Sequence, residues 1–333
     1  IGDHHRVVAS DGVRKGRCGM TNFFKTFDGK IQEIEQAQEG CWVSMTAPGM
    51  SEIRTIAELY EIDVDDLRAA LDLDERSRIE VEDNYTMILV NIPTIEADNE
   101  KELYNTIPLS IFITKKSVVT VCGEETPVLK AFETGRVRDF HTNMKSRFIL
   151  QVLYRIATLY LQYLRTIDKK SEEVENELHR STQNRELIEL LKLEKSLVYF
   201  TTALRSNEVV LEKLLRNEVI KQYPEDSDLL EDVIVENKQA IEMANIYTGI
   251  LSGTMDAFAS VISNNLNIVM KFLAIITIVM AIPTMIFSAY GMNLASGGMP
   301  FSGSNHGFVI VVGIAALISL IVVIIFRKMK LFK

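Results

Sequence analysis

The sequence predicts a mixed α/β domain near the N-terminus, long helices after it, and two membrane-spanning helices at the C-terminal end. Three observations support this order. Strand-like and helix-like segments alternate up to Cys122, helical periodicity dominates from residue 128, and no Asp, Glu, Lys or Arg occurs from Phe272 to Phe326. Alternating short segments are typical of an α/β domain, whereas a long uncharged run is typical of a chain that crosses a bilayer.

The α/β domain is expected to cover residues 20–126. Residues 1–19, which include His4 and His5, are expected to be a tag or a leader segment ahead of a natural start at Met20. Two short helices are predicted at residues 51–60 and 63–72, opened by Ser51 and Asp63 as caps. Four segments rich in β-branched and aromatic side chains predict strands, at residues 41–47, 85–93, 107–114 and 117–122.

A helical stalk is expected at residues 127–270. Apolar residues step by three and four from Phe148 to Ile167, and the pattern predicts helix over residues 128–222. On its own, the charge-rich remainder of this stretch is typical of a solvated coiled-coil face. Pro224 interrupts the pattern and the next proline is Pro283, so a single helix of about 87 Å fits between them at 1.5 Å per residue.

The uncharged run contains two 19-residue apolar segments, Phe272–Tyr290 and Phe308–Phe326. A bilayer needs about 20 apolar residues in a helix, so we predict a membrane domain at residues 271–333 with an outer loop at 291–307. A buried helical hairpin of a soluble protein is the alternative, disfavoured because such cores rarely contain apolar runs of this length. Basic residues flank the spans and leave the loop uncharged, which places the loop outside and both termini in the cytoplasm. These residues are Lys271, Arg327, Lys328, Lys330 and Lys333.

Charge and motif content limit the classes of function. Residues 1–326 hold 45 acidic side chains against 32 basic ones, a balance that repels nucleic acid and attracts cations, or that only aids solubility. Cys18, Cys41 and Cys122 show no CxxC or disulfide-type spacing, which fits a reducing compartment. The sequence contains no GxxxxGK[ST] loop, no HExxH and no nucleophile elbow, so an enzyme is not expected.

One face of the helix after Pro224 is small or polar except at Met270, and it continues into the first span. Its 3.5-residue average spacing is that of a seam in a left-handed bundle. Such a stripe fits either tight helix packing or a water-filled pore, and the pore is favoured because Asp256 opens the stripe and Asn267, Thr277, Thr284 and Ser288 offer oxygen atoms. A pore also requires several copies around an axis. The full stripe is Gly249, Gly253, Asp256, Ser260, Ser263, Asn267, Met270, Ala274, Thr277, Ala281, Thr284, Ser288 and Gly291.

The motif at the outer end of this stripe, Tyr290-Gly291-Met292-Asn293, resembles that of the CorA family of magnesium transporters. The two C-terminal spans, the upstream Ile282-Pro283-Thr284, the basic tail and residues 70–85 are similar to the same family. The resemblance implies a funnel-shaped homopentamer in the cytoplasmic membrane that admits Mg²⁺. It also implies a selectivity filter at Gly291, Met292 and Asn293, with a ring of Asn293 amides holding a hydrated ion.

The resemblance implies two further groups of residues. Met270 and Leu273 fall where the family has a hydrophobic constriction, and they are expected to line the pore with Asp256, Asn267, Thr277, Thr284 and Ser288. Asp83 and Asp232 resemble the family's regulatory acids, at which cytoplasmic Mg²⁺ closes the channel. Asp232 lies in an acidic cluster that invites cations, although an exposed helix face is the commoner origin of such clusters.

The outer loop departs from the family pattern. Many relatives carry an acidic Met-Pro-Glu-Leu segment after the motif, whereas this chain has Met299-Pro300-Phe301-Ser302. The sequence therefore leaves Co²⁺, Ni²⁺ and Zn²⁺ open beside Mg²⁺, although the loop lacks a Cys/His set for zinc. A non-conducting membrane scaffold is the other alternative, disfavoured by the cost of polar groups in the bilayer.

Overall fold

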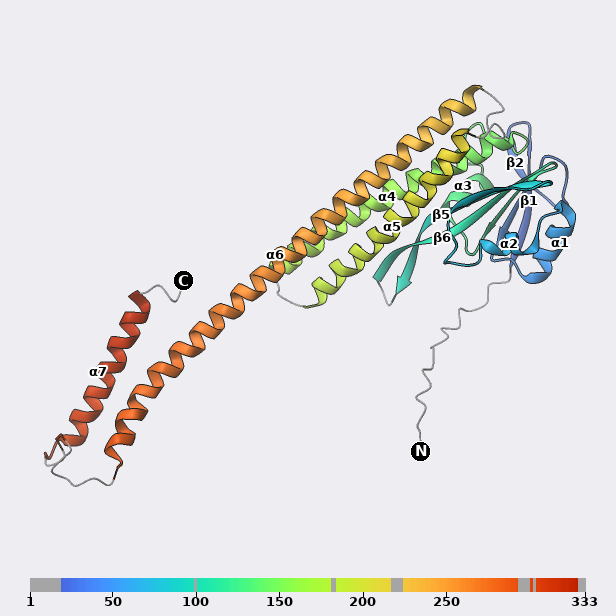
Figure 1. The fold of residues 1–333 in the computed structure, drawn as a ribbon. Helices are drawn as coiled ribbons and strands as arrows, with labels where there is room; N and C mark the ends of the chain where they lie inside the picture. Colours follow the sequence, from blue (N-terminus) through green and yellow to red (C-terminus); the bar gives the residue numbers. More distant parts are fainter. Residues whose placement is uncertain are drawn as a thin grey trace, which may run out of the picture. The chain divides into compact units, whose positions relative to one another are not determined.

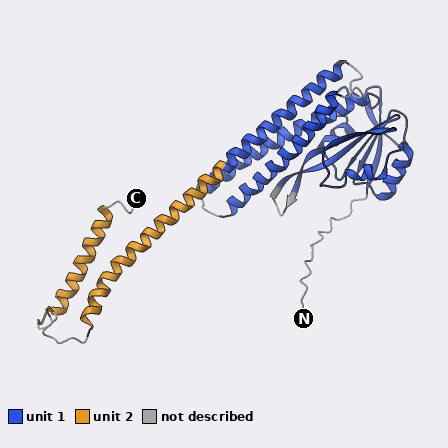
Figure 2. Cartoon of the chain, in the orientation of Figure 1, with its two compact units in different colours: residues 1–252 blue, residues 253–333 orange. Residues whose placement is uncertain are grey.

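The computed structural model describes residues 19–98, 101–180, 184–216, 224–292, 300–301 and 304–328. The chain divides into two compact units, residues 1–252 and 253–333 (Figure 2). The helix α6 (Pro224–Tyr290) contributes residues to both units, and α7 (Gly307–Lys328) belongs to the second.

The first unit is built on a seven-stranded sheet in the order β2-β1-β3-β7-β6-β5-β4 (Figure 1). β3 and β7 run parallel and every other neighbouring pair is antiparallel. The strands are β1 (Met20–Phe27), β2 (Lys30–Ile34), β3 (Trp42–Thr46), β4 (Arg78–Val81), β5 (Tyr85–Asp98), β6 (Lys101–Thr114) and β7 (Val118–Cys122).

Helices cover both faces of this sheet because its side chains alternate between two apolar cores. Val43 and Met45 of β3 point to the core formed with α1 (Met50–Tyr60) and α2 (Val64–Ala69). Trp42 points to the other face, where its ring packs against Phe132 of α3 (Pro127–Glu133) and Phe148 of α4 (Lys145–Arg180). α5 (Asn184–Arg216) packs against α4 and the long β5–β6 hairpin, where its Phe200 contacts Tyr160 of α4 and Tyr104 of β6.

A buried amide fastens α5 to the edge of the sheet. β4 pairs with β5 only as far as Leu89, and the side chain of Asn207 takes the backbone hydrogen bonds two residues further on. Its Oδ1 accepts from the Asn91 N–H at 2.9 Å, and its Nδ2 donates to the Asn91 carbonyl at 2.8 Å. Because Asn207 and Asn91 are buried, this pair satisfies backbone groups that water does not reach.

The structure confirms the predicted strands and short helices and corrects the sequence analysis at four points. β1, β2 and β4 were not predicted. Residues 134–144 are not helical, so the predicted helix over 128–222 is wrong in that stretch. The first helix is capped at Gly49, whose N–H donates to Glu52 Oε2 at 2.8 Å, and Ser51 lies inside it. The second helix ends at Ala69, short of the predicted residue 72. As the predicted span requires, α6 continues through Pro283, where a proline removes one backbone donor without ending the helix.

Candidate functional site

The two helices of the second unit expose their apolar residues. α6 and α7 are each long and apolar enough to cross a membrane, yet only 6% of the most apolar window of α6 and 11% of that of α7 is buried. The core helix of a soluble protein is mostly buried, so these helices do not form such a core within one chain. Exposed apolar surface of this extent fits a bilayer, further copies of the chain, or both.

α6 has two opposite faces in this unit. Ile275, Val279, Ile282 and Ile286 form its least exposed face, and Ile275 is buried together with Val311 and Ala315 of α7. Thr277, Ala281, Thr284 and Ser288 point the other way and are exposed. From Thr277 to Ser288 the polar stripe predicted from the sequence therefore lies opposite the face of α6 that is buried with α7, as a face that lines a pore has to be.

Three hydroxyl groups of the stripe donate to their own helix. Thr277 Oγ1 donates to the Leu273 carbonyl at 2.8 Å, and Thr284 Oγ1 donates to the Met280 carbonyl at 2.9 Å. Ser260 Oγ donates to the Asp256 carbonyl in the same way. A hydroxyl carries one proton, so each oxygen then presents only lone pairs outward. The water molecules around a cation point their protons outward, so a row of hydrogen-bond acceptors can bind the hydrated ion.

The other predicted pore residues also lie on exposed positions of α6. Asp256, Asn267 and Ser288 are exposed, and the side chains of Met270 and Leu273 are 57% and 56% exposed. One helix supplies only one wall, so a single chain does not bring these side chains around a common axis.

The C-terminal end of α6 is closed by backbone and tyrosine contacts. The Gly291 N–H is shared between the carbonyls of Phe287 (2.9 Å) and Ser288 (3.2 Å). The Tyr290 hydroxyl donates to the Pro300 carbonyl at 3.0 Å, a contact the sequence analysis did not foresee. Gly291 and Met292 are exposed at this end, and Asn293, the third residue of the predicted filter, lies outside the described residues.

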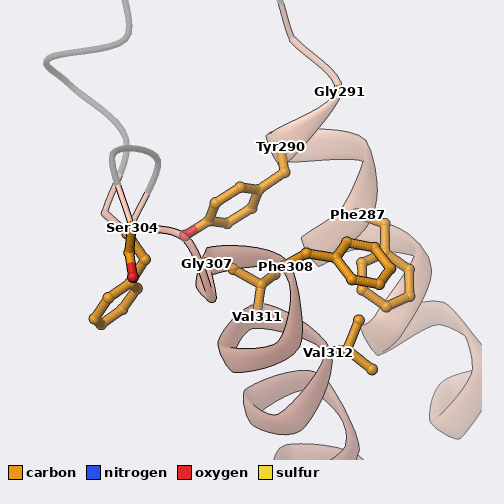
Figure 3. A pocket seen from close by; sticks show the side chains of 9 residues that line it. Phe287, Tyr290, Gly291, Ser304, Gly307, Phe308, Val311 and Val312 are labelled. Carbon is orange, nitrogen blue, oxygen red and sulfur yellow. The ribbon is translucent and has the colours of Figure 1, made fainter.

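A pocket of about 390 Å³ lies between this end of α6 and the start of α7 (Figure 3). Phe287, Tyr290, Phe301 and Phe308 supply aromatic walls. Gly307 is required here, because a Cβ atom at this position would lie 2.3 Å from the Phe301 carbonyl oxygen. The pocket is thus a consequence of a tight turn that begins α7.

The predicted regulatory acids lie on different elements of the first unit. Asp83 is exposed in the turn between β4 and β5, which the Glu82 N–H closes by donating to the Tyr85 carbonyl at 2.9 Å. Tyr85 is anchored by its hydroxyl, which donates to Asp66 Oδ2 at 2.5 Å. Burial, and then this bond to Asp66, raises the pKa of Tyr85. Asp232 is exposed on α6.

The structure also divides the acidic cluster around Asp232. Asp226 is 1% exposed and accepts a hydrogen bond from Ser146 Oγ at 2.6 Å, and Glu225 pairs with Arg147 at 2.9 Å. These carboxylates fix the start of α6 against α4 and are not free for a cation. Within the described ranges no three His, Cys, Asp or Glu side chains are grouped to hold a metal ion.

Three comparisons bear on this arrangement. The family described as CorA-like Mg²⁺ transporter protein matches residues 37–328. The cobalt/magnesium transport protein CorA of Methanocaldococcus jannaschii is 28% identical over 296 residues, which cover 86% of this chain and 90% of that protein. The protein of the same name from Thermotoga maritima is 24% identical over 313 residues, covering 92% of this chain and 88% of that one.

A solved structure has the same fold. The complete structure of the CorA magnesium transporter from Methanocaldococcus jannaschii matches with a TM-score of 0.80 at 24% sequence identity, covering 93% of this chain and 98% of that chain. The match includes both units, so the α/β unit and the two C-terminal apolar helices occur together in that protein as well.

Proposed function

This chain belongs to the CorA family of Mg²⁺ transporters, and we propose that it admits Mg²⁺ to the cell across the cytoplasmic membrane through a pore lined by α6. Members of this family are channels or transporters, so the chain is a transport protein and not an enzyme. In this proposal the chain has three parts, which are an α/β domain at residues 20–126, a stalk at 127–270 and a membrane domain at 271–333.

The observation that carries the proposal is the exposed stripe of acceptor oxygens on α6. Polar groups facing lipid are costly, and this face lies opposite the one that is buried with α7. A ring of copies with the stripes turned inward places those oxygens in water and leaves the apolar faces for lipid and for neighbouring helices. The proposed ring has five copies, the number that the resemblance to the family implies. The loop between the two spans lies outside the cell, and both termini lie in the cytoplasm.

Selection occurs, in this proposal, at Gly291, Met292 and Asn293. Mg²⁺ releases its water reluctantly, so five neutral carboxamides at Asn293 hold the hydrated ion by hydrogen bonds to its waters. Gly291 and Met292 are the last described residues at this end of α6, which fits a filter at the outer mouth of the stripe.

Gating and regulation are assigned to the cytoplasmic side. Met270 and Leu273 form a hydrophobic constriction that closes the pore by excluding water. Asp83 and Asp232 bind cytoplasmic Mg²⁺ between neighbouring copies and hold the channel shut. Their exposure on the first unit supports a role between chains, because neither has a partner for a metal site within its own chain among the described residues.

Uptake into proteoliposomes tests the proposal. The full chain is reconstituted with a Mg²⁺-sensitive dye inside, at low internal Mg²⁺, and compared with Asn293→Ala and with Asn305→Ala as a matched control in the outer segment. We expect uptake by the wild type and by Asn305→Ala, and strong loss in Asn293→Ala. No uptake by the correctly inserted wild type would defeat the transport proposal and leave the scaffold alternative.

Co²⁺ is the second candidate ion, because two relatives carry the name cobalt/magnesium transport protein. Co²⁺, Ni²⁺ and Zn²⁺ are added as competitors in the same assay. The ion that reduces Mg²⁺ entry at the lowest concentration, and itself enters the vesicles, identifies the preferred cargo.

A further inference from the structure

The pocket between the C-terminal end of α6 and the start of α7 has no role in the proposed pore. Its volume of about 390 Å³ lies within the range of about 300–1,000 Å³ that is usual for small-molecule sites. Phe287 and Tyr290 line it from α6. Phe308, Val311 and Val312 line it from α7 (Figure 3). The hydroxyl residues of the stripe are not among its described lining residues, so the pocket belongs to the side of α6 that meets α7.

The wall of this pocket is uncharged and mostly apolar. Four aromatic side chains and two valines supply most of it. No Asp, Glu, Lys or Arg occurs from Phe272 to Phe326, so the two spans offer a charged ligand no counter-charge here. Burying an unpaired charge is costly, whereas burying methylene groups is favourable. The wall therefore fits an alkyl chain.

One side of the pocket is closed and the other is exposed. Val311 is 7% exposed and Gly307 is buried, so these two residues form the closed side. Phe308 and Val312 are 81% and 37% exposed, and Val309 next to them is 66% exposed. In a bilayer these exposed apolar side chains meet lipid tails. A tail can therefore enter the pocket from this side without passing a polar group.

The polar groups of the pocket lie at the end of the two spans. The Tyr290 hydroxyl donates to the Pro300 carbonyl at 3.0 Å, which leaves the face of its ring to the pocket. Ser304 Oγ accepts from the His306 N–H at 3.3 Å, so its own proton stays available for an ester or phosphate oxygen. Tyrosine is typical of the membrane interface, because it has an apolar ring and a polar tip. This order of groups matches a phospholipid, with a tail along the wall and the headgroup at the polar end.

We propose that the pocket holds an acyl chain of a phospholipid from the leaflet at the C-terminal end of α6. This inference rests on the proposed membrane insertion of α6 and α7. A water-sized group takes about 30 Å³ in a liquid, so the pocket has room for roughly a dozen methylene-sized groups, a large part of one chain. A free fatty acid fits less well, because its carboxylate finds no Lys or Arg in the uncharged run. The bound chain packs the last turn of α6 against the first turn of α7, beside Gly291.

Photolabelling of the full chain tests this lipid site. The protein is reconstituted in phosphatidylcholine vesicles in which a small fraction of the lipid carries a diazirine in the middle of one acyl chain. It is irradiated either in the vesicles or after transfer to lipid-free detergent, and the adducts are located by mass spectrometry. Leu317 and Leu320 are 57% and 56% exposed on α7 and should be labelled only in the vesicles. Tyr290 and Val311 should be labelled in both cases, because a chain held in the pocket survives the transfer.

A pair of matched variants ties the retained lipid to the pocket. Val312→Trp fills the pocket with a larger side chain, whereas Val309→Trp makes the same change on the same helix outside the pocket lining. We expect Val312→Trp to lower the retained adducts several-fold and Val309→Trp to leave them near the wild-type level. Equal retention in both variants would place the lipid elsewhere and overturn the assignment. The labelling of the wild type decides the question independently if Val312→Trp does not fold.

The outcomes separate the lipid site from the proposed channel. Loss of every wild-type adduct on transfer to detergent means exchanging boundary lipid only, and it overturns the inference. Absence of adducts at Tyr290 and Val311 in the vesicles also overturns it, and is the result expected if another copy of the chain covers the pocket. Mg²⁺ uptake that persists in either case leaves the channel standing. Retained adducts in a protein that takes up no Mg²⁺ support the lipid site and defeat the transport proposal.

Discussion

Replacing the stripe threonines by valine tests the acceptor face of α6 directly. Thr277 and Thr284 each donate to the carbonyl one turn earlier, at 2.8 and 2.9 Å, and so present only lone pairs outward. Valine keeps the branched shape and a similar helix propensity but removes the oxygen. Serine keeps the oxygen and its backbone bond, which makes Thr→Ser the matched control.

The expected loss follows from the number of acceptors removed. In a ring of five copies each Thr→Val change removes five acceptors. Loss of even one hydrogen bond to the hydrated ion, about 0.5–1.5 kcal/mol, slows Mg²⁺ entry about 2- to 13-fold, so each change should cost at least this much. The two positions are seven residues apart, about 10 Å along the helix, and effects at that separation are close to additive. The double variant should therefore lose about the product of the two single factors.

The assay is Mg²⁺ uptake into proteoliposomes, normalised to the amount of inserted protein. Thr277→Ser and Thr284→Ser should stay near the wild-type rate. Unchanged uptake in both valine variants would refute the idea that the ion passes this face. Equal losses in the serine and valine variants would show that these residues act by packing and not by their oxygens.

Three further predictions concern the gate, the regulatory acids and the fold. Met270→Gly with Leu273→Gly should raise Mg²⁺ leak several-fold at high internal Mg²⁺, because water then enters the constriction, and unchanged flux would contradict the gate. Asp83→Ala with Asp232→Ala should keep uptake active as internal Mg²⁺ rises, and normal closure in this variant would show the sensing assignment to be wrong. Asn207→Ala should lower the free energy of unfolding by about 1–3 kcal/mol, since it leaves the buried Asn91 N–H unpaired while the Asn91 carbonyl keeps its hydrogen bond from Tyr160. The sole tryptophan is buried in the first unit, so its fluorescence during denaturation measures this loss, and a change within about 0.5 kcal/mol would contradict the role of the amide.

The sequence predicted four interior strands and missed both edge strands and β1, for a physical reason. β1 lies inside the sheet, but Phe24 is its only buried residue, so no buried apolar run marks it. β3, β5, β6 and β7 lie inside the sheet, where both faces are covered and β-branched residues accumulate. β2 and β4 occupy the two edges and carry mostly exposed or half-exposed residues, so no apolar run marks them. Pairing with a neighbour creates these strands, and a single-segment pattern does not contain that information.

The candidate site also has one part that the sequence predicts and another that it does not. The stripe on α6 follows from helical spacing alone, and the structure places it opposite the face that meets α7. The bond from Tyr290 to Pro300 joins residues across a loop, and the buried Asp226 depends on Ser146 in another helix. Such contacts depend on the folded path of the chain. Asp83 and Asp232 remain predictions, since their proposed site needs a neighbouring chain.

The order of polar groups along α6 follows from how many hydrogen bonds each group requires. Between Phe272 and Ala289 the polar side chains are Thr277, Thr284 and Ser288. The hydroxyls of Thr277 and Thr284 each have one proton, which their own helix accepts, so they need no water as an acceptor inside the bilayer. A carboxamide has two N–H protons, and the carbonyl one turn earlier takes up only one of them, as with Asn176 and Glu172 in α4, while a carboxylate is charged. Amides and carboxylates are therefore expected only where water reaches the pore, and Asp256, Asn267 and Asn293 stand on either side of this segment in the sequence.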